Sequence, residues 1–256
     1  MGWQIVEWLR RQGEDIVALA IHPASRRRYG KQIVDSSGVD PSCIFDASRL
    51  DRPETLAAIK KLDPEIGISA FFGYILSTEV LDLVPAGYIN IHPALLPYNR
   101  GAYPNVWSIV DGTPAGVTIH YLDEGVDTGD IVAQRRVAVD LDDTGETLYR
   151  KLERAAVDLF KATWPLIRRG DASRVPQNRD AGTCHRVRDV ERIDEIDLDR
   201  TYTARELINI LRARTFPPHT GAYFRHGEQR IHLRLQLLSD AEQRQEKEAN
   251  GEVPGD

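Results

Sequence analysis

The stretch Ile89-Asn90-Ile91-His92-Pro93 decides the fold and the chemistry expected of this chain. Side chains of a β-strand alternate between its two faces, so Asn90 and His92 are predicted to project from the same face. Pro93 lacks the N–H that a central strand needs and is expected to end the strand. Ligands of open α/β sheets usually bind at the carboxyl ends of the strands. We therefore expect an amide and an imidazole together at a ligand-binding edge.

Helical and strand-like patterns alternate on both sides of that stretch, which predicts parallel βαβ units. Strands are expected at residues 15–22, 65–72, 87–91, 116–121 and 130–137. Helices are expected at residues 3–12, 53–62, 77–84 and 146–168. The fold class predicted is therefore α/β, a Rossmann-like, doubly wound and mostly parallel sheet.

The remainder of the chain is expected to form a small C-terminal appendage. We predict a main catalytic domain at residues 1–170, a polar linker at 171–190 and a small subdomain at 191–238. A helix at 204–214 and a hairpin around a loop at 226–230 make up this subdomain. Residues 239–256 carry six acidic and two basic residues with almost nothing apolar, and are expected to be disordered.

Composition limits the possible partners. The 256 residues are 41% hydrophobic, enough for a full core, and the formal net charge of −6 argues against nucleic acid as a partner. The absence of an apolar run of about 18 residues argues against a membrane, and a cytoplasmic location is expected. Cys43 and Cys184 have no CxxC spacing, so neither a disulfide nor a metal site is expected.

A second motif, Gly125-Val126-Asp127-Thr128-Gly129, offers a carboxylate to the same sheet edge. An amide, an imidazole and a carboxylate around one carbonyl carbon are suited to acyl transfer to an amine. Taken alone, a His beside a Pro is more often a hydrogen-bonded structural residue.

The whole block Ser69–Gln134 resembles the 10-formyltetrahydrofolate-dependent formyltransferases, with the Asn-x-His-Pro and Asp-x-Gly elements in that family's order. The resemblance extends over roughly residues 2–235. It implies that Asn90 holds the formyl carbonyl and stabilises the oxyanion, and that His92 shuttles the proton. Asp127 is then expected to orient His92 and to raise its pKa. No metal is required.

The same resemblance implies two loops that bind N10-formyltetrahydrofolate, the expected co-substrate. Their residues are Phe72, Gly73, Tyr74, Ile75 and Leu76 in one loop, and Asp123, Gly125 and Val126 in the other. For individual side chains of the first loop, packing in the core is an equally good explanation, because an aromatic and aliphatic run beside a strand is usually buried.

Segments 96–107 and 212–224 resemble those of the nucleotide-sugar N-formyltransferases. This implies a dTDP- or UDP-linked amino-deoxy sugar as acceptor and a homodimer as the assembly. The expected substrate-binding residues are Tyr98, Asn99, Arg100, Gly101, Thr215 and Phe216.

Three alternatives stay open. Methionyl-tRNA formyltransferases are close relatives with a larger C-terminal module, whereas about 65 residues, with an acidic tail, follow the linker here. The other two are a hydrolase that releases formate from formyl-folate and a catalytically dead module that binds folate or nucleotide.

The start of the chain departs from the family pattern. The family opens with a short apolar strand inside the sheet, whereas this sequence starts directly at the first helix, Gly2-Trp3-Gln4-Ile5-Val6. Without an interior strand, two sheet edges and their backbone polar groups are left open. Either the recorded start lies after this strand or the sheet has adapted to its loss, and we expect the first.

Overall fold

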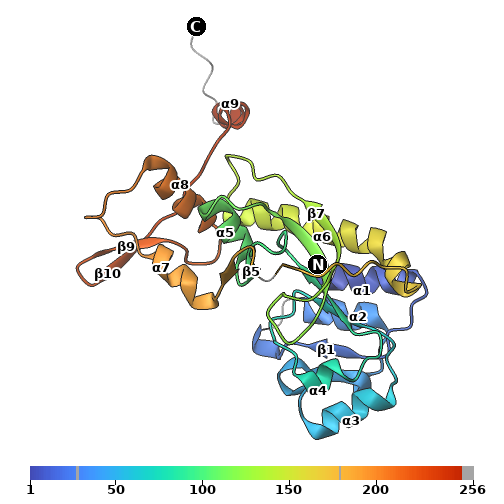
Figure 1. Cartoon of the computed structure of the whole chain (residues 1–256). Coiled ribbons are helices and arrows are strands. Elements are labelled where there is room, and N and C mark those ends of the chain that lie inside the picture. Colours follow the sequence, from blue (N-terminus) through green and yellow to red (C-terminus); the bar gives the residue numbers. More distant parts are fainter. Residues whose placement is uncertain (27–28, 179, 250–256) are drawn as a thin grey trace.

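A computed structural model describes residues 1–26, 29–178 and 180–249, and Figure 1 shows how its helices and strands are arranged. The main domain contains a four-stranded mixed sheet. The sheet order is β3 (Gly67–Ala70), β4 (Tyr88–His92), β6 (Gly116–Tyr121) and β7 (Ile131–Arg136). β3 and β4 are parallel, whereas β6 runs antiparallel to both β4 and β7. The predicted α/β class is confirmed, and the strand with the Asn-x-His pair lies in the interior of this sheet.

Helices cover both faces of the sheet, as the predicted double winding requires. Ile89 and Ile91 of β4 are fully buried in the main core with residues of α1 (Gly2–Arg11) and α6 (Gly145–Arg168). Tyr88 points to the opposite face and packs in a second core with α3 (Pro53–Lys61) and α4 (Thr78–Leu81). Asn90 and His92 are two and four residues beyond Tyr88 in the strand, so their side chains lie on this second face as well.

The shorter elements complete the main domain. α5 (Pro104–Val110) is almost entirely buried, and α2 (Gly30–Ser37) packs against α1. The single turns are η1 (Ala24–Arg26), η2 (Pro41–Cys43), η3 (Ala47–Arg49) and η4 (Val187–Val190). β1 (Leu19–Ile21) and β2 (Ile44–Asp46) form a separate parallel pair. β1 is shorter than the strand predicted at residues 15–22 because only β2 pairs with it.

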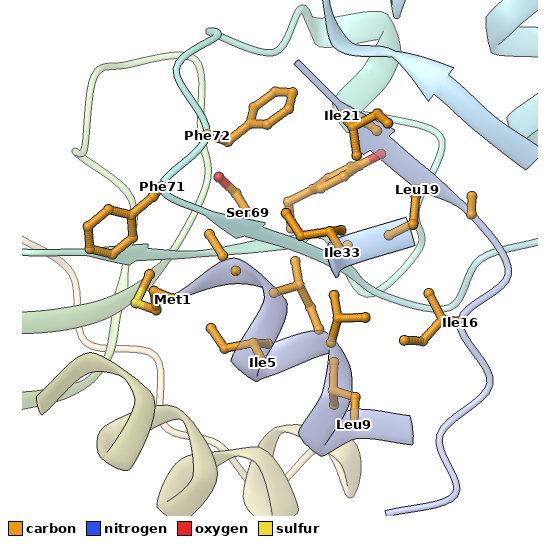
Figure 2. A pocket seen from close by; sticks show the side chains of 18 of the residues that line it. Met1, Ile5, Leu9, Ile16, Leu19, Ile21, Ile33, Ser69, Phe71 and Phe72 are labelled. Atoms are coloured by element: carbon orange, nitrogen blue, oxygen red, sulfur yellow. The ribbon is translucent and has the colours of Figure 1, made fainter. Parts of the chain in front are cut away.

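A cavity of about 1380 Å³ separates β1 from β3. Within the described residues each of these strands has a partner on one side only. Every residue of 13–22 and of 62–73 lines the cavity. A cavity on one face of a strand would contact only every second residue, so this cavity must run along the edges of the two strands. Figure 2 shows apolar side chains of α1, α2 and β1 gathered around it, with Ser69 and Phe72 on the β3 side. The absence of the family's first strand stays a prediction, and the facing edges of β1 and β3 are its physical basis.

The predicted linker contains ordered pairings. Cys184–His185 forms β8, which pairs in parallel with β5 (Arg100–Gly101), and Val175 bridges to Ile131 of β7. This segment therefore runs along the main domain, held there by backbone hydrogen bonds. Sequence composition did not indicate these pairings because they involve only one or two residues each.

The C-terminal subdomain contains the predicted helix and hairpin. The elements are α7 (Glu191–Asp194), α8 (Ala204–Ala213), β9 (Tyr223–His226) and β10 (Gln229–His232). The hairpin connection has two residues rather than the predicted five, because Gly227 adopts a φ of +59° that permits a tight turn.

The first part of the tail that was expected to be disordered has a helical conformation. Asp240–Ala249 forms α9, in which no residue is buried. Ser239 and Glu242 exchange hydrogen bonds at its start, which is a capping box, and the helix is rich in good helix formers. Residues 250–256 lie outside the described part. Among the described residues, none of the helices combines the length and the apolar character that a membrane span needs.

Candidate active site

The register of the sheet aligns polar residues in two rows on one face. Asn90 lies directly opposite Ser69 of β3 and His120 of β6, so one row crosses three strands. His92 lies opposite Thr118. Residues directly opposite on neighbouring strands point to the same face, which brings Asn90 and His92 together with side chains from both adjacent strands.

Asp127 reaches this face from the loop between β6 and β7. Its carboxylate Oδ2 accepts a 2.8 Å hydrogen bond from the Gly101 N–H and lies 3.6 Å from Nδ1 of His92. Its Oδ1 accepts a hydrogen bond of 3.3 Å from the amide nitrogen of Asn90. Asp127 itself has a left-handed φ of +54°, a conformation that Asp adopts more readily than most residues. The structure thus brings together the three predicted catalytic residues.

His92 is buried with one ring nitrogen already occupied. Its Nε2 lies 3.1 Å from the carbonyl oxygen of Asn99; a carbonyl only accepts, so Nε2 carries the proton. Nδ1 therefore has the free lone pair of the neutral ring and faces Asp127. A proton accepted at Nδ1 is stabilised directly by that carboxylate.

The pKa of His92 corrects the sequence-based argument. Burial lowers this pKa below its ordinary value and outweighs Asp127 and the Asn99 carbonyl, which raise it. Asp127 does favour the protonated ring, as expected, but the net direction is downward. His92 is consequently neutral near pH 7 and able to accept a proton.

Burial raises the pKa of Asp127, but His92, His120 and the N–H of Gly101 outweigh it and lower this pKa to about 2. A carboxylate that stays ionised throughout the physiological range is available to stabilise the imidazolium form of His92. The described residues contain no group of three or more His, Cys, Asp or Glu side chains arranged to hold a metal ion.

The segment predicted as a linker holds the catalytic loop in place. The Gln177 side-chain amide donates to the carbonyl oxygens of Asp127 and Gly129, at 3.0 and 2.7 Å. The hydroxyl of Thr183 donates to Oδ1 of Asn99 and accepts from its N–H. This segment thereby orders both the Asp127 loop and the loop whose carbonyl binds His92.

The residues expected to bind folate lie in two different settings. Phe72 and Leu76 pack against the second core, whereas Ile75 is 79% exposed. The Gly73 N–H donates to Nε2 of His22, whose ring lies 5.4 Å from that of Tyr74. In the second loop, Asp123 accepts hydrogen bonds from Gly125 and Thr128 and so orders its own turn, and Val126 is exposed.

The residues expected to bind the acceptor are more dispersed. Asn99 is fully buried and its amide donates to Ser108 and Thr113, so it supports His92 rather than facing a ligand. Tyr98 is exposed, and Arg100 donates to the carbonyl of Ala181.

The last three of these residues are held by contacts within the chain. The Gly101 N–H binds Asp127. Thr215 donates to the Leu211 carbonyl and accepts from the N–H of Leu235, and the ring of Phe216 lies 5.4 Å from that of Tyr149.

Sequence reasoning missed Ser69, His120 and Gln177. Ser69 and His120 each supply a polar group in contact with the side chain of Asn90. Each is a polar residue within a largely apolar strand, Gly67–Ala70 for Ser69 and Gly116–Tyr121 for His120. Each also occupies a strand position whose side chain lies on the same face as Asn90, and these two features could have identified both residues. Gln177 had no comparable signal because it lies in irregular polar sequence.

This geometry, an amide donor, a neutral imidazole and an ionised carboxylate at the end of an α/β strand, defines a site for acyl transfer. Residues 9–163 match the Formyl transferase family, and residues 189–239 match the N-formyltransferase dimerization C-terminal domain. The chain belongs to the formyl transferase family.

Relatives of known description fall into two groups. The chain is 38% identical over 181 residues to a methionyl-tRNA formyltransferase of Symbiobacterium thermophilum, and spans about half of that protein (54%) and 70% of its own length. It is also similar to the crystal structure of a 4-N formyltransferase from Francisella tularensis, with 30% identity, a TM-score of 0.78 and coverage of 92% of this chain and 93% of that one.

A third relative is the formyltransferase PseJ from Anoxybacillus kamchatkensis, solved in complex with UDP-4,6-dideoxy-4-formamido-L-AltNAc and tetrahydrofolate. It is 33% identical, with a TM-score of 0.56 and coverage of 69% of this chain and 89% of that one.

Proposed function

We propose that this protein transfers a formyl group from N10-formyltetrahydrofolate to the amine of a nucleotide-linked amino-deoxy sugar, with dTDP or UDP as the nucleotide. The observation that carries the proposal is the convergence of Asn90, His92 and Asp127 at one end of β4, with His92 Nδ1 3.6 Å from the carboxylate. Each of the three groups has a task in the transfer of a formyl group between two nitrogens.

His92 accepts the proton that the acceptor amine loses as its nitrogen bonds to the formyl carbon. The proton binds at Nδ1, where Asp127 stabilises the resulting imidazolium ion. Asn90 donates an N–H to the carbonyl oxygen while that oxygen carries negative charge. His92 then returns the proton to the departing nitrogen as the old carbon–nitrogen bond breaks. The products are a formamide and tetrahydrofolate, and the ring of His92 is neutral again.

Folate supplies the activated formyl group, and two loops of this chain fit it. Ile75 and Val126 are large apolar side chains that are exposed on the two predicted folate-binding loops, 79% and 44% respectively. Exposed apolar side chains on two loops beside a catalytic cluster are suited to the faces of a flat ring system.

The assignment of an amino sugar is supported by two of the similar structures, a 4-N formyltransferase and a formyltransferase with a UDP-linked formamido sugar. The homology of residues 189–239 to a dimerization domain supports a homodimer. Sedimentation of the purified protein tests the dimer. A single species of monomer mass at micromolar concentration contradicts it.

The acceptor is tested with a panel of dTDP- and UDP-linked 3-amino and 4-amino sugars, following the release of tetrahydrofolate. We expect turnover with at least one sugar, and none with His92→Ala. Folate or nucleotide binding without turnover of any amine favours a dead module. Formate release in the absence of any amine favours a hydrolase.

Methionyl-tRNA is the second candidate acceptor, because a methionyl-tRNA formyltransferase is 38% identical to this chain over 181 residues. A gel-shift with tRNA at physiological salt distinguishes the two acceptors. The net charge of −6 predicts no shift. A specific shift together with formylation of methionyl-tRNA replaces the sugar proposal.

A further inference from the structure

The side chain of Asn90 is held on both sides by its row on the sheet. On one side, the hydroxyl of Ser69 donates a 2.8 Å hydrogen bond to Oδ1 of Asn90. On the other side, the amide nitrogen of Asn90 lies 3.2 Å from Nε2 of His120. Ser69, Asn90 and His120 come from β3, β4 and β6 and face one another directly in the strand register. Ser69 and His120 lie beside the reacting groups without being part of the catalytic trio.

The tautomer inferred for His120 rests on its contacts with Tyr121 and Asn90. Nδ1 lies 2.8 Å from the carbonyl oxygen of Tyr121, which only accepts, so Nδ1 carries a proton. In the neutral ring Nε2 then has a lone pair, which matches the N–H of Asn90. Nε2 also lies 3.4 Å from Oδ1 of Asp127, so a proton on Nε2 that is directed at this carboxylate is the competing arrangement. His120 is fully buried, so water does not compete for the bond to Asn90.

The opposite orientation of the Asn90 amide is unfavourable at two of its three contacts, whereas the Ser69 hydroxyl can donate or accept and so tolerates both orientations. The opposite orientation turns the carbonyl oxygen toward the Asp127 carboxylate, now 3.3 Å from the amide nitrogen, and toward the lone pair of His120. Asn90 has two N–H groups, and one is fixed by His120. The other donates to Oδ1 of Asp127 at 3.3 Å, and in the proposed reaction it is the N–H that turns to the formyl oxygen.

From this geometry we infer that His120, assisted by Ser69, is a positioning residue that fixes which end of the Asn90 amide faces the reacting carbonyl. The inference rests on the proposed function, because it gives Asn90 the oxyanion. His120 does not contact substrate in this arrangement and acts through Asn90.

Two substitutions of His120 separate this role from general support of the fold. In His120→Asn the shorter amide reaches only the Tyr121 carbonyl and the acceptor facing Asn90 is lost. In His120→Gln the longer side chain places its oxygen near the former Nε2. We expect His120→Asn to lower kcat about 10- to 100-fold with KM changed less than about threefold. His120→Gln is expected to recover at least about tenfold of that loss at a similar melting temperature.

A double-mutant cycle tests whether the effect passes through Asn90, using the acceptor with the highest turnover in the sugar panel. In an Asn90→Ala background, His120→Asn is expected to cause no further loss of kcat. An undiminished loss in that background overturns the inference, since His120 then acts through Asp127 or the fold. If Asn90→Ala alone leaves kcat unchanged, the proposed role of Asn90 fails instead.

An independent measurement needs no turnover. Long-range proton–nitrogen NMR correlation of histidine-labelled protein reports which ring nitrogen of His120 carries the proton. We expect the Nδ1–H tautomer at neutral pH in the wild type, and its retention in Ser69→Ala. An Nε2–H tautomer contradicts the inference, because that nitrogen then donates and has no lone pair for Asn90.

Discussion

Replacement of Asp127 by Asn tests the electrostatic core of the proposed mechanism. The carboxylate is 12% exposed and lies 3.6 Å from Nδ1 of His92. Unit charges at about that distance attract by roughly 4–5 kcal/mol at an effective dielectric constant of about 20. Because about 1.4 kcal/mol corresponds to a tenfold change in rate, we expect Asp127→Asn to lower kcat about 10²- to 10³-fold.

The pH profile gives a second readout of the same substitution. In the wild type, burial holds the pKa of His92 below 6.5, so the acid limb of kcat/KM lies below that pH. Asp127 raises this pKa, and its removal moves the limb to lower pH. Rates are measured from tetrahydrofolate release with the best sugar acceptor between pH 5 and 8.

The matched control for this substitution is Asp130→Asn. Asp130 is three residues away, is 39% exposed and lies 3.6 Å from Arg174. Its loss removes the same charge from the surface, and kcat is expected to stay within about twofold. An acid limb that does not move in Asp127→Asn, with kcat within threefold of the wild type, refutes the reasoning.

Three further predictions concern the scaffold. Gly101→Ala places a Cβ 2.3 Å from the His185 carbonyl oxygen at a φ of +86°, so we expect a destabilisation of about 2–4 kcal/mol in urea unfolding, and an unchanged midpoint contradicts the contact. Because the pKa of Asp127 is about 2 in the fold against 3.8 ordinarily, its stabilising contribution is present above pH 4 and lost as the pH falls toward 2. The stability advantage of wild type over Asp127→Asn should therefore shrink by about 2 kcal/mol between pH 5 and 2; a constant difference argues against the depressed pKa. An apolar five-residue strand joined upstream of Met1 by a short turn should fill the cavity between β1 and β3 and raise the melting temperature, whereas a matched Gly/Ser extension should not. Equal melting temperatures dispose of the strand prediction.

Local periodicity was sufficient for much of the fold. The strand period of two in the predicted strand at residues 87–91 placed Asn90 and His92 on one face, and the register of β4 (Tyr88–His92) confirms it. The helical spacing of Leu148, Leu152 and Leu159 likewise predicted the long helix α6. These predictions succeed because strand and helix periods depend on neighbours a few residues apart, which the sequence contains directly.

Interactions between distant segments were beyond such reasoning. Gln177 lies about 50 positions from the carbonyl groups that it binds, and its surroundings gave no periodic signal. Asn99 was expected to face the acceptor but is fully buried, where its carbonyl fixes the ring of His92. Whether a polar side chain contacts a ligand or forms hydrogen bonds within its own chain depends on how the loops pack on the sheet.

The sequence by itself determined the α/β architecture, the strand that carries the amide and imidazole, and the carboxylate that joins them. Only the tertiary structure decided the direction of the His92 pKa shift, because desolvation depends on the atoms that surround the ring. It also decided that Ser69 and His120 support Asn90, since this requires the register of three strands. The pattern of a chain specifies which face each side chain takes, whereas burial and the partners across the sheet arise only when segments distant in the chain come into contact.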